Sequence, residues 1–286
     1  MKILVRVALS FLVFILSSTL FASLASAGQS QRPILIISDI DDTIKVSGVL
    51  TPLVLARALD HNTPFAGMAS LYQLIVNQNP AQTKVFYLSN APKEVLGLEP
   101  MRESHQALLD TNKFPQGELI LRDSLLDEGF KNRTISNLVK QYNPAFVFFF
   151  GDNGEKDVFT YEKATAELKV LGIGSLTYIH QVYSSVDGSF YSFQGKALRP
   201  GQTGYATAVE VGIDLYTKKL LSEQSLDWML NHTARYITNE GFLKLDFNSP
   251  VAFPMFMNCS DFKWNKNWTI DAETLDYKLF VESKCH

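Results

Sequence analysis

Short runs of apolar residues recur along the chain, and a helix-like stretch separates each run from the next. The clearest runs cover residues 34–37, 85–88, 119–121, 146–150 and 176–179. Short, largely apolar runs of this kind are typical of strands buried on both faces of a parallel sheet. The stretches between them show helical spacing of apolar residues, at 50–59, 68–76, 93–109, 133–142 and 155–171. This alternation predicts an α/β fold, with a parallel sheet flanked by helices.

Composition and charge exclude several classes of protein. Of the 286 residues, 46% are hydrophobic and 19% are charged, so the chain can bury a sizeable core and is not disordered. The formal net charge is −3, without the basic excess of nucleic-acid-binding proteins, so we expect no nucleic-acid partner. The sequence does not indicate the oligomeric state.

The first 27 residues differ from the rest. Lys2 and Arg6 precede an apolar stretch over residues 7–24, and Ala25-Ser26-Ala27 follows as a small-x-small cleavage signal. This pattern predicts a cleaved signal peptide at 1–27 and export to the periplasm or the outside of the cell. The alternative is an uncleaved membrane anchor, because the apolar stretch is nearly long enough to span a bilayer.

The composition of the sequence changes again near residue 185. Residues 28–185 form the predicted α/β core, and residues 186–286 form a C-terminal extension of unknown role. The extension begins with a stretch rich in Gly, Ser and aromatic residues, followed by helix-like segments at 205–221 and 225–240. Its aromatic tail is either core or a surface that seeks a membrane interface.

The chain has two cysteines, Cys259 and Cys285, both near its C-terminus. In an exported protein this pair predicts a disulfide that ties down the tail. The alternative is a pair of free thiols.

An acidic motif follows the first apolar run directly. Asp39-Ile40-Asp41-Asp42-Thr43 lies where open α/β sheets bind ligands, at the carboxyl end of a buried parallel strand. Neighbouring carboxylates repel one another, and a hard cation such as Mg²⁺ relieves that repulsion. The alternative is an acidic turn in which Asp42 or Thr43 caps the next segment.

Polar residues occupy equivalent places after the later strands. Ser89 and Asn90 follow the second strand, and the hydroxyl of Ser89 is suited either to hold a phosphate oxygen or to cap a helix. Lys131 stands at the start of a helix-like segment. Asp152 and Asp157 follow the fourth strand, where they would bring further carboxylates to the same metal, or would cap a helix after a Gly-rich turn.

These four motifs, in this order, resemble the motif set of the haloacid dehalogenase (HAD) superfamily of phosphohydrolases. Within that superfamily, the chain resembles the catalytic domain of actin-patch-type phosphatidate phosphatases over about residues 33 to 183. The resemblance rests on the segments Ser38-Asp39-Ile40-Asp41-Asp42-Thr43-Ile44-Lys45, Tyr87-Leu88-Ser89-Asn90-Ala91-Pro92, Leu121-Arg122-Asp123 and Gly151-Asp152-Asn153-Gly154-Glu155-Lys156-Asp157.

The resemblance implies a HAD-like (Rossmann-like) fold and a two-step hydrolysis of a phosphate monoester. Asp39 would be the nucleophile and Asp41 the general acid and base, while Ser89 and Lys131 would hold phosphoryl oxygens. Asn90 is a further candidate for contact with the substrate. A magnesium ion would bind Asp39, Asp152, Asp157 and the backbone carbonyl of Asp41, and it would be the cofactor.

The spacing of the motifs leaves no room for a large cap domain. The stretches from Thr43 to Ser89 and from Ser89 to Lys131 are mostly taken up by the expected helices and strands. An open site suits a bulky phosphorylated substrate such as a lipid headgroup, with peripheral membrane contact, unless the extension folds over it.

Three functions stay open at this point. They are a phosphatase that converts phosphatidate to diacylglycerol, a broad-specificity exported acid phosphatase for soluble phosphomonoesters, and a non-catalytic module that binds phosphatidate. Both Asp39 and Asp41 are present, which favours catalysis. The five histidines are scattered and are expected to be structural; they are His61, His105, His180, His232 and His286.

Overall fold

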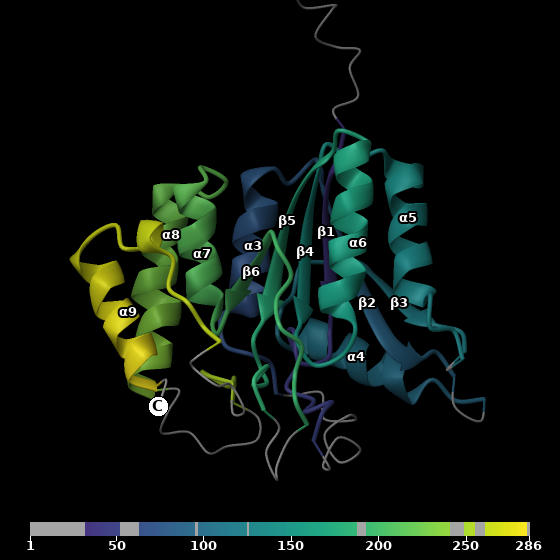
Figure 1. Ribbon diagram of the computed structural model, residues 1–286, viewed down its shortest axis with the longest axis horizontal. Helices are drawn as coiled ribbons and strands as arrows, with labels where there is room; N and C mark the ends of the chain where they lie inside the picture. Colours follow the sequence, from purple (N-terminus) through teal and green to yellow (C-terminus); the bar gives the residue numbers. More distant parts are fainter. Residues whose placement is uncertain are drawn as a thin grey trace, which may run out of the picture. The chain divides into compact units, whose positions relative to one another are not determined.

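A sheet of six parallel strands forms the centre of the described chain, in the order β3-β2-β1-β4-β5-β6 (Figure 1). The strands are β1 (Ile34–Asp39), β2 (Thr83–Pro92), β3 (Glu118–Arg122), β4 (Phe146–Asp152), β5 (Gly174–His180) and β6 (Gln202–Tyr205). The computed structural model describes residues 32–51, 63–94, 97–124, 126–187, 193–240, 249–254 and 261–284. The predicted α/β class is confirmed.

The sheet continues beyond the five strands expected from the sequence. The strand β6, with the sequence Gln-Thr-Gly-Tyr, pairs with β5 at the edge of the sheet. Only its last residue is buried, so it has no apolar run by which it could be recognised. It also lies after residue 185, so the region set apart as an extension contributes to the sheet.

Helices cover both faces of the sheet. One face carries α3 (Met68–Gln78), α4 (Pro100–Thr111) and α7 (Ala208–Thr217), and the other carries α5 (Phe130–Tyr142) and α6 (Asp157–Val170). Successive residues of a strand point to opposite faces. In β1, Ile36 accordingly packs in the first layer, and Leu35 and Ile37 pack in the second.

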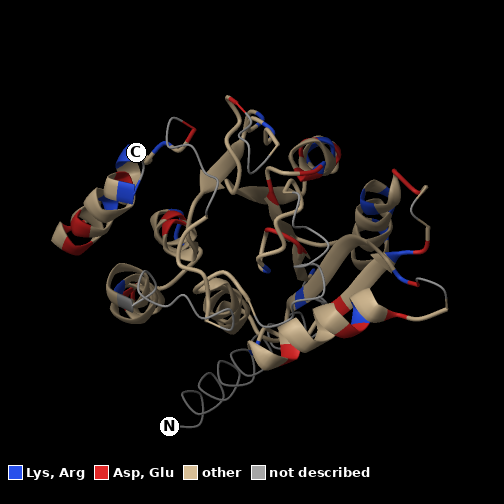
Figure 2. Cartoon of the chain, turned by 90° about the horizontal axis from the view of Figure 1, so that it is seen from below, with Lys and Arg blue, Asp and Glu red and all other residues tan. Residues whose placement is uncertain are grey.

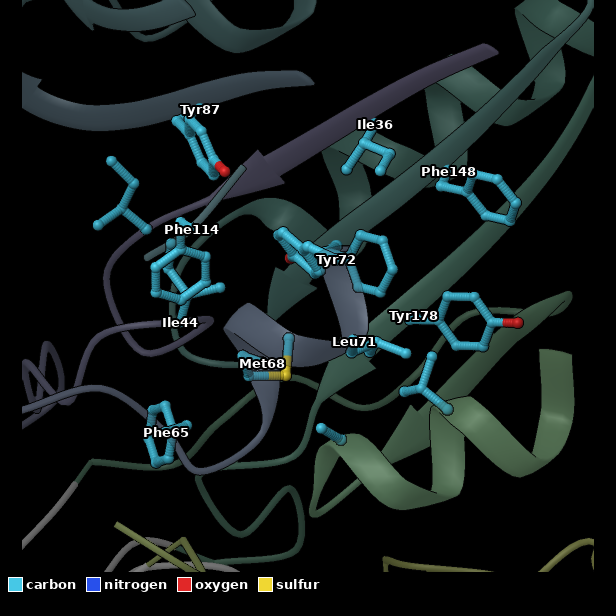
Figure 3. Close-up of a cluster of buried hydrophobic side chains, with 14 of the residues drawn as sticks. Ile36, Ile44, Phe65, Met68, Leu71, Tyr72, Tyr87, Phe114, Phe148 and Tyr178 are labelled. Atoms are coloured by element: carbon cyan, nitrogen blue, oxygen red, sulfur yellow. The ribbon is translucent and has the colours of Figure 1, made fainter. Parts of the chain in front are cut away.

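The first of these layers holds most of the large aromatic side chains. Figure 3 shows Tyr72 of α3 between the sheet and the loop that follows β1. Its ring lies 4.7 Å from that of Phe150 in β4, and its hydroxyl lies 2.8 Å from the hydroxyl of Ser38 in β1. This packing fixes the end of β1, which carries the first acidic motif.

Two helices begin later than the sequence suggested. The helix expected from residue 93 starts at Pro100, because β2 runs on to Pro92 and proline is favoured in the first turn of a helix. The helix expected from residue 205 starts at Ala208, after β6. Its first turn is closed by a capping box between Thr207 and Glu210.

The C-terminal helices pack on the outer side of α7. They are α8 (Glu223–Met229), the π-helical turns η1 (Leu230–Ala234) and η2 (Tyr236–Glu240), the 3-10 turn η3 (Lys266–Trp268) and α9 (Ala272–Lys284). Val209 and Ile213 of α7 face this cluster, whereas Val211 and Leu215 face the sheet. Trp268 is buried, so this part of the aromatic tail is core.

Several predictions concern residues outside the described part. The signal peptide at 1–27, the disulfide between Cys259 and Cys285, and nearly all of the helix expected at 50–59 fall there. They stay predictions. Within the residues that the structure describes, no helix combines the length and the apolar character needed to cross a bilayer.

We expect Trp268→Ala to lower the free energy of unfolding by about 3 to 5 kcal/mol, as measured by urea unfolding. The side chain is 1% exposed, and its Nε1 donates a hydrogen bond of 2.9 Å to Asp214 Oδ1 of α7. Trp228→Ala, at a position that is 40% exposed, is the control and should cost about 1 kcal/mol or less. A loss of about 1 kcal/mol or less for Trp268→Ala would show that burial of this side chain does not stabilise the fold.

Candidate active site

Three aspartates and a lysine meet at the carboxyl edge of the sheet. Asp39 ends β1, Asp152 ends the adjacent strand β4, and Asp157 begins α6 immediately afterwards. Lys131 reaches the same place from the first turn of α5. All four side chains are buried. Figure 2, which views the molecule from below, shows acidic segments among the strand ends.

Lys131 joins two of these carboxylates. Its Nζ lies 2.7 Å from Asp39 Oδ1 and 2.5 Å from Asp157 Oδ1. Burial alone would lower the pKa of Lys131, but the two aspartates outweigh burial and raise the pKa above its ordinary value. Lys131 therefore stays protonated, and it compensates part of the negative charge.

One lysine does not neutralise three buried carboxylates. Burial, together with mutual repulsion, raises the pKa of Asp39 and Asp152 well above the ordinary value, and burial raises that of Asp157 too. Asp157 Oδ2 has no hydrogen-bond partner among the described residues. The three side chains offer oxygen atoms that lie within 4.8 Å of one another. This donor set fits a hard divalent cation.

Asp41 is set apart from this acidic cluster. Its side chain is 18% exposed, and it accepts hydrogen bonds from Ser47 Oγ at 2.5 Å and from Ser89 Oγ at 3.2 Å. Burial would raise the pKa of Asp41. The nearby His105 and Lys45, together with the two hydroxyl donors, outweigh burial and lower it.

Ser89 lies beside Asp41, at the same edge of the sheet as Asp39. Leu88 pairs with Asp39 in the sheet, so the next residue of β2 faces the loop that follows β1. Asn90 points elsewhere, since its Nδ2 donates to Glu155 Oε2 at 2.9 Å in an exposed contact. Asn90, which lies in β2, is thus linked to the loop after β4.

Asp42 organises the loop after β1 and does not join the acidic cluster. It has a positive φ of 57°, an unusual conformation for a non-glycine residue. Its carboxylate accepts hydrogen bonds from the backbone N–H groups of Ser47, Gly48 and Val49 and from the hydroxyl of Tyr183. These contacts hold the loop in one conformation.

The structure brings together residues that can transfer a phosphoryl group. Asp39 is a buried carboxylate beside a cationic lysine, and Asp41, two residues on, has access to solvent. A nucleophile and a proton donor in such a pair, next to a cation site, are the groups that a two-step phosphatase needs.

Residues 34–171 match the family model described as phosphatidate phosphatase APP1, catalytic domain. The recognition made from the motifs is confirmed over this segment, which is a HAD-like phosphatase catalytic domain. It contains every candidate site residue, from Asp39 to Asp157. None of the curated proteins searched matches the chain.

His105 lies beside the site residues of this domain, although it stands in none of the four motifs. His105 is fully buried on α4, and its Nε2 lies 3.1 Å from Ser89 Oγ and 3.5 Å from Asp41 Oδ2. His180, by contrast, is structural as expected. Its ring nitrogens face the backbone carbonyls of Asp42 and Ala206, and burial lowers its pKa to about 4.

We expect Asp152→Asn to stabilise the protein in the presence of a chelator. A carboxyl whose pKa is raised by folding binds more protons in the folded chain than in the unfolded one, so stability falls as the pH rises above the ordinary value of 3.8. The asparagine of the variant does not ionise, so its stability does not fall with pH for this reason. Its advantage in urea unfolding should therefore grow with pH, to about 1 to 3 kcal/mol at pH 8.

The same variant should lose stabilisation by divalent cations. Millimolar Mg²⁺ should raise the melting temperature of the wild type and have little effect on Asp152→Asn. The matched control is Asp110→Asn on the exposed face of α4, which should behave as the wild type. An equal response to Mg²⁺ in all three proteins would contradict a cation site at Asp152.

Proposed function

We propose that this protein is a magnesium-dependent phosphatase that hydrolyses phosphatidate to diacylglycerol through an aspartyl-phosphate. The observation that carries the proposal is the placement of Asp39 and Asp41. One is a buried carboxylate paired with Lys131, and the other is a partly exposed carboxylate beside Ser89. The family match supports a phosphatase of this kind.

In the first step, a carboxylate oxygen of Asp39 attacks phosphorus. The bond from phosphorus to the oxygen of diacylglycerol breaks, and Asp41 gives its proton to that oxygen. In the second step, Asp41 takes a proton from water, which attacks phosphorus and releases Asp39 and phosphate. Lys131 and Ser89 hold the remaining phosphoryl oxygens.

Asp41 must carry a proton in the first step, although its pKa is lowered in the structure. An anionic phosphoryl group beside Asp41 raises the pKa again, because a like charge disfavours the carboxylate. Binding of the substrate therefore prepares Asp41 for its role as an acid.

The buried carboxylates of Asp39, Asp152 and Asp157 would hold Mg²⁺, together with the backbone carbonyl of Asp41. The ion, when bound, neutralises charge on the phosphoryl group and on the carboxylates themselves.

Lipid specificity is supported by the surface around the site. Leu98, Leu126, Val186 and Phe193 follow strands β2, β3 and β5 on the side of the catalytic loops, and all four are largely exposed. Basic and acidic residues are interspersed along the described segments on this side (Figure 2). We propose that these apolar side chains contact the bilayer at its periphery.

We also propose that residues 1–27 are a signal peptide and that the enzyme acts in the periplasm or outside the cell, as the pattern of the N-terminus predicts. The mature protein should begin at Gly28 when it is recovered from its native host. N-terminal sequencing that finds residues 1–27 retained would contradict this.

We expect Asp39→Asn to lower kcat by about 1,000-fold or more while the protein stays folded, because the nucleophile is lost. The measurement is phosphate release from phosphatidate in mixed micelles and from p-nitrophenyl phosphate, with Mg²⁺ and with a chelator. Faster release from the soluble ester would favour the broad-specificity phosphatase. Binding of phosphatidate without release from either substrate would favour the binding module.

We expect Leu126→Ser to lower activity on phosphatidate vesicles several-fold and to leave hydrolysis of p-nitrophenyl phosphate unchanged, since only the lipid requires contact with a bilayer. Val170→Ser is the matched control. The two side chains are 90% and 88% exposed, but Val170 ends α6, which begins at the catalytic edge and runs away from it. Equal activities of the two variants on vesicles would contradict contact through the loop at Leu126.

A further inference from the structure

The hydroxyl of Ser89 has three partners, and together they use its full hydrogen-bonding capacity. It donates to Asp41 Oδ2 at 3.2 Å, accepts from the backbone N–H of Ala91 at 3.0 Å and lies 3.1 Å from His105 Nε2. A serine hydroxyl has one hydrogen to donate and two lone pairs to accept with. An ionised Asp41 and the N–H of Ala91 leave one lone pair, so His105 must be the donor.

This pattern determines which ring nitrogen of His105 donates a hydrogen bond. Nε2 carries the hydrogen that Ser89 accepts, whereas Nδ1 has no partner among the described residues. The ring is fully buried, so water does not compete for Ser89 from this side.

Ser104, the neighbour of His105 in α4, contacts the loop that follows β1. Ser104 Oγ accepts a hydrogen bond of 3.0 Å from Lys45 Nζ, and Lys45 contributes positive charge near Asp41. Leu108 and Leu109, one turn further on, pack in the core beneath the sheet. Helix α4 therefore presents Ser104 and His105 to the catalytic loops from a fixed position.

We propose that His105 is a positioning residue that acts through Ser89. By occupying one lone pair of the hydroxyl, it restricts the single hydrogen of Ser89 to two acceptors: the carboxylate of Asp41 and a phosphoryl oxygen of the substrate. When a phosphoryl group binds, the hydrogen turns from Asp41 to that group. The inference rests on the proposed function and assigns a role to a residue that lies outside the four motifs.

The experiment compares His105→Leu, His105→Gln and Ser89→Ala, each in the full chain. Leucine removes the donor, and glutamine keeps an N–H donor near the position of Nε2. We expect His105→Leu to lower kcat for p-nitrophenyl phosphate by about tenfold to 100-fold with a much smaller change in KM. His105→Gln should recover most of this loss.

A double-mutant cycle separates positioning from a merely structural role. If His105 acts through Ser89, the double variant with His105→Leu and Ser89→Ala should be no slower than Ser89→Ala alone. Leu108→Ala is the structural control, because it removes a buried side chain of the same helix that has no hydrogen-bonding group. It should lower stability and leave kcat of the folded protein unchanged. Additive losses in the cycle would overturn the proposal.

Binding of inorganic phosphate gives a second readout that does not depend on turnover. Calorimetry should show that His105→Leu and Ser89→Ala weaken phosphate binding by similar factors and that His105→Gln weakens it less. A wild type that hydrolyses no ester would contradict the proposed function, and phosphate affinity would still decide the role of His105. Undiminished phosphate affinity in His105→Leu would overturn that role.

Discussion

The candidate site depends on one interaction, the pairing of a buried lysine with two buried aspartates. Lys131 comes from α5, Asp39 from β1 and Asp157 from α6, so the three charges join elements that are far apart in the sequence. An unpaired charge in such a place costs several kcal/mol, which makes each partner necessary to the others. The net charge of the paired groups and Asp152 is negative, and it favours the binding of a cation at this edge of the sheet.

In the loop after β1, a buried carboxylate is stabilised in a different way. Asp42 is as deeply buried as the acidic cluster, but donors from the backbone and from Tyr183 satisfy its oxygens. Adjacent aspartates in the sequence thus serve opposite purposes. Asp41 keeps contact with solvent and can exchange a proton, whereas Asp42 is held still so that Asp39 and Asp41 keep their places.

Much of this arrangement could be predicted from the sequence, because it follows a rule about strand ends. Asp39, Ser89 and Asp152 directly follow or end apolar runs, so a parallel sheet brings them to one edge without knowledge of side-chain contacts. The short edge strand β6 lacked such a signal. His105 was missed for another reason: it approaches Ser89 from the face of a helix, and the register of α4 depends on where Pro100 starts it.

The separate uses of Asp41 and Asp42 could not be read from the sequence either. Their carboxylates differ by the donors that reach them, and those donors come from loops and from Tyr183, far along the chain. A pattern of residue types indicates which functional groups lie at the end of a strand. Which of two adjacent aspartates contacts solvent, and which one stabilises the loop, depends on how the chain packs around them.

The double-sided burial of α7 has a consequence for the modularity of this protein. The segment that carries the chemistry by sequence ends at residue 171, before β5, β6 and α7. Cut there, the sheet would end at β4, with the backbone of a long apolar strand open to other chains. One face of α3 would also lose the helix that covers it. The catalytic module defined by motifs is therefore smaller than the module that can fold, and a transplant of this chemistry must carry the chain through α7.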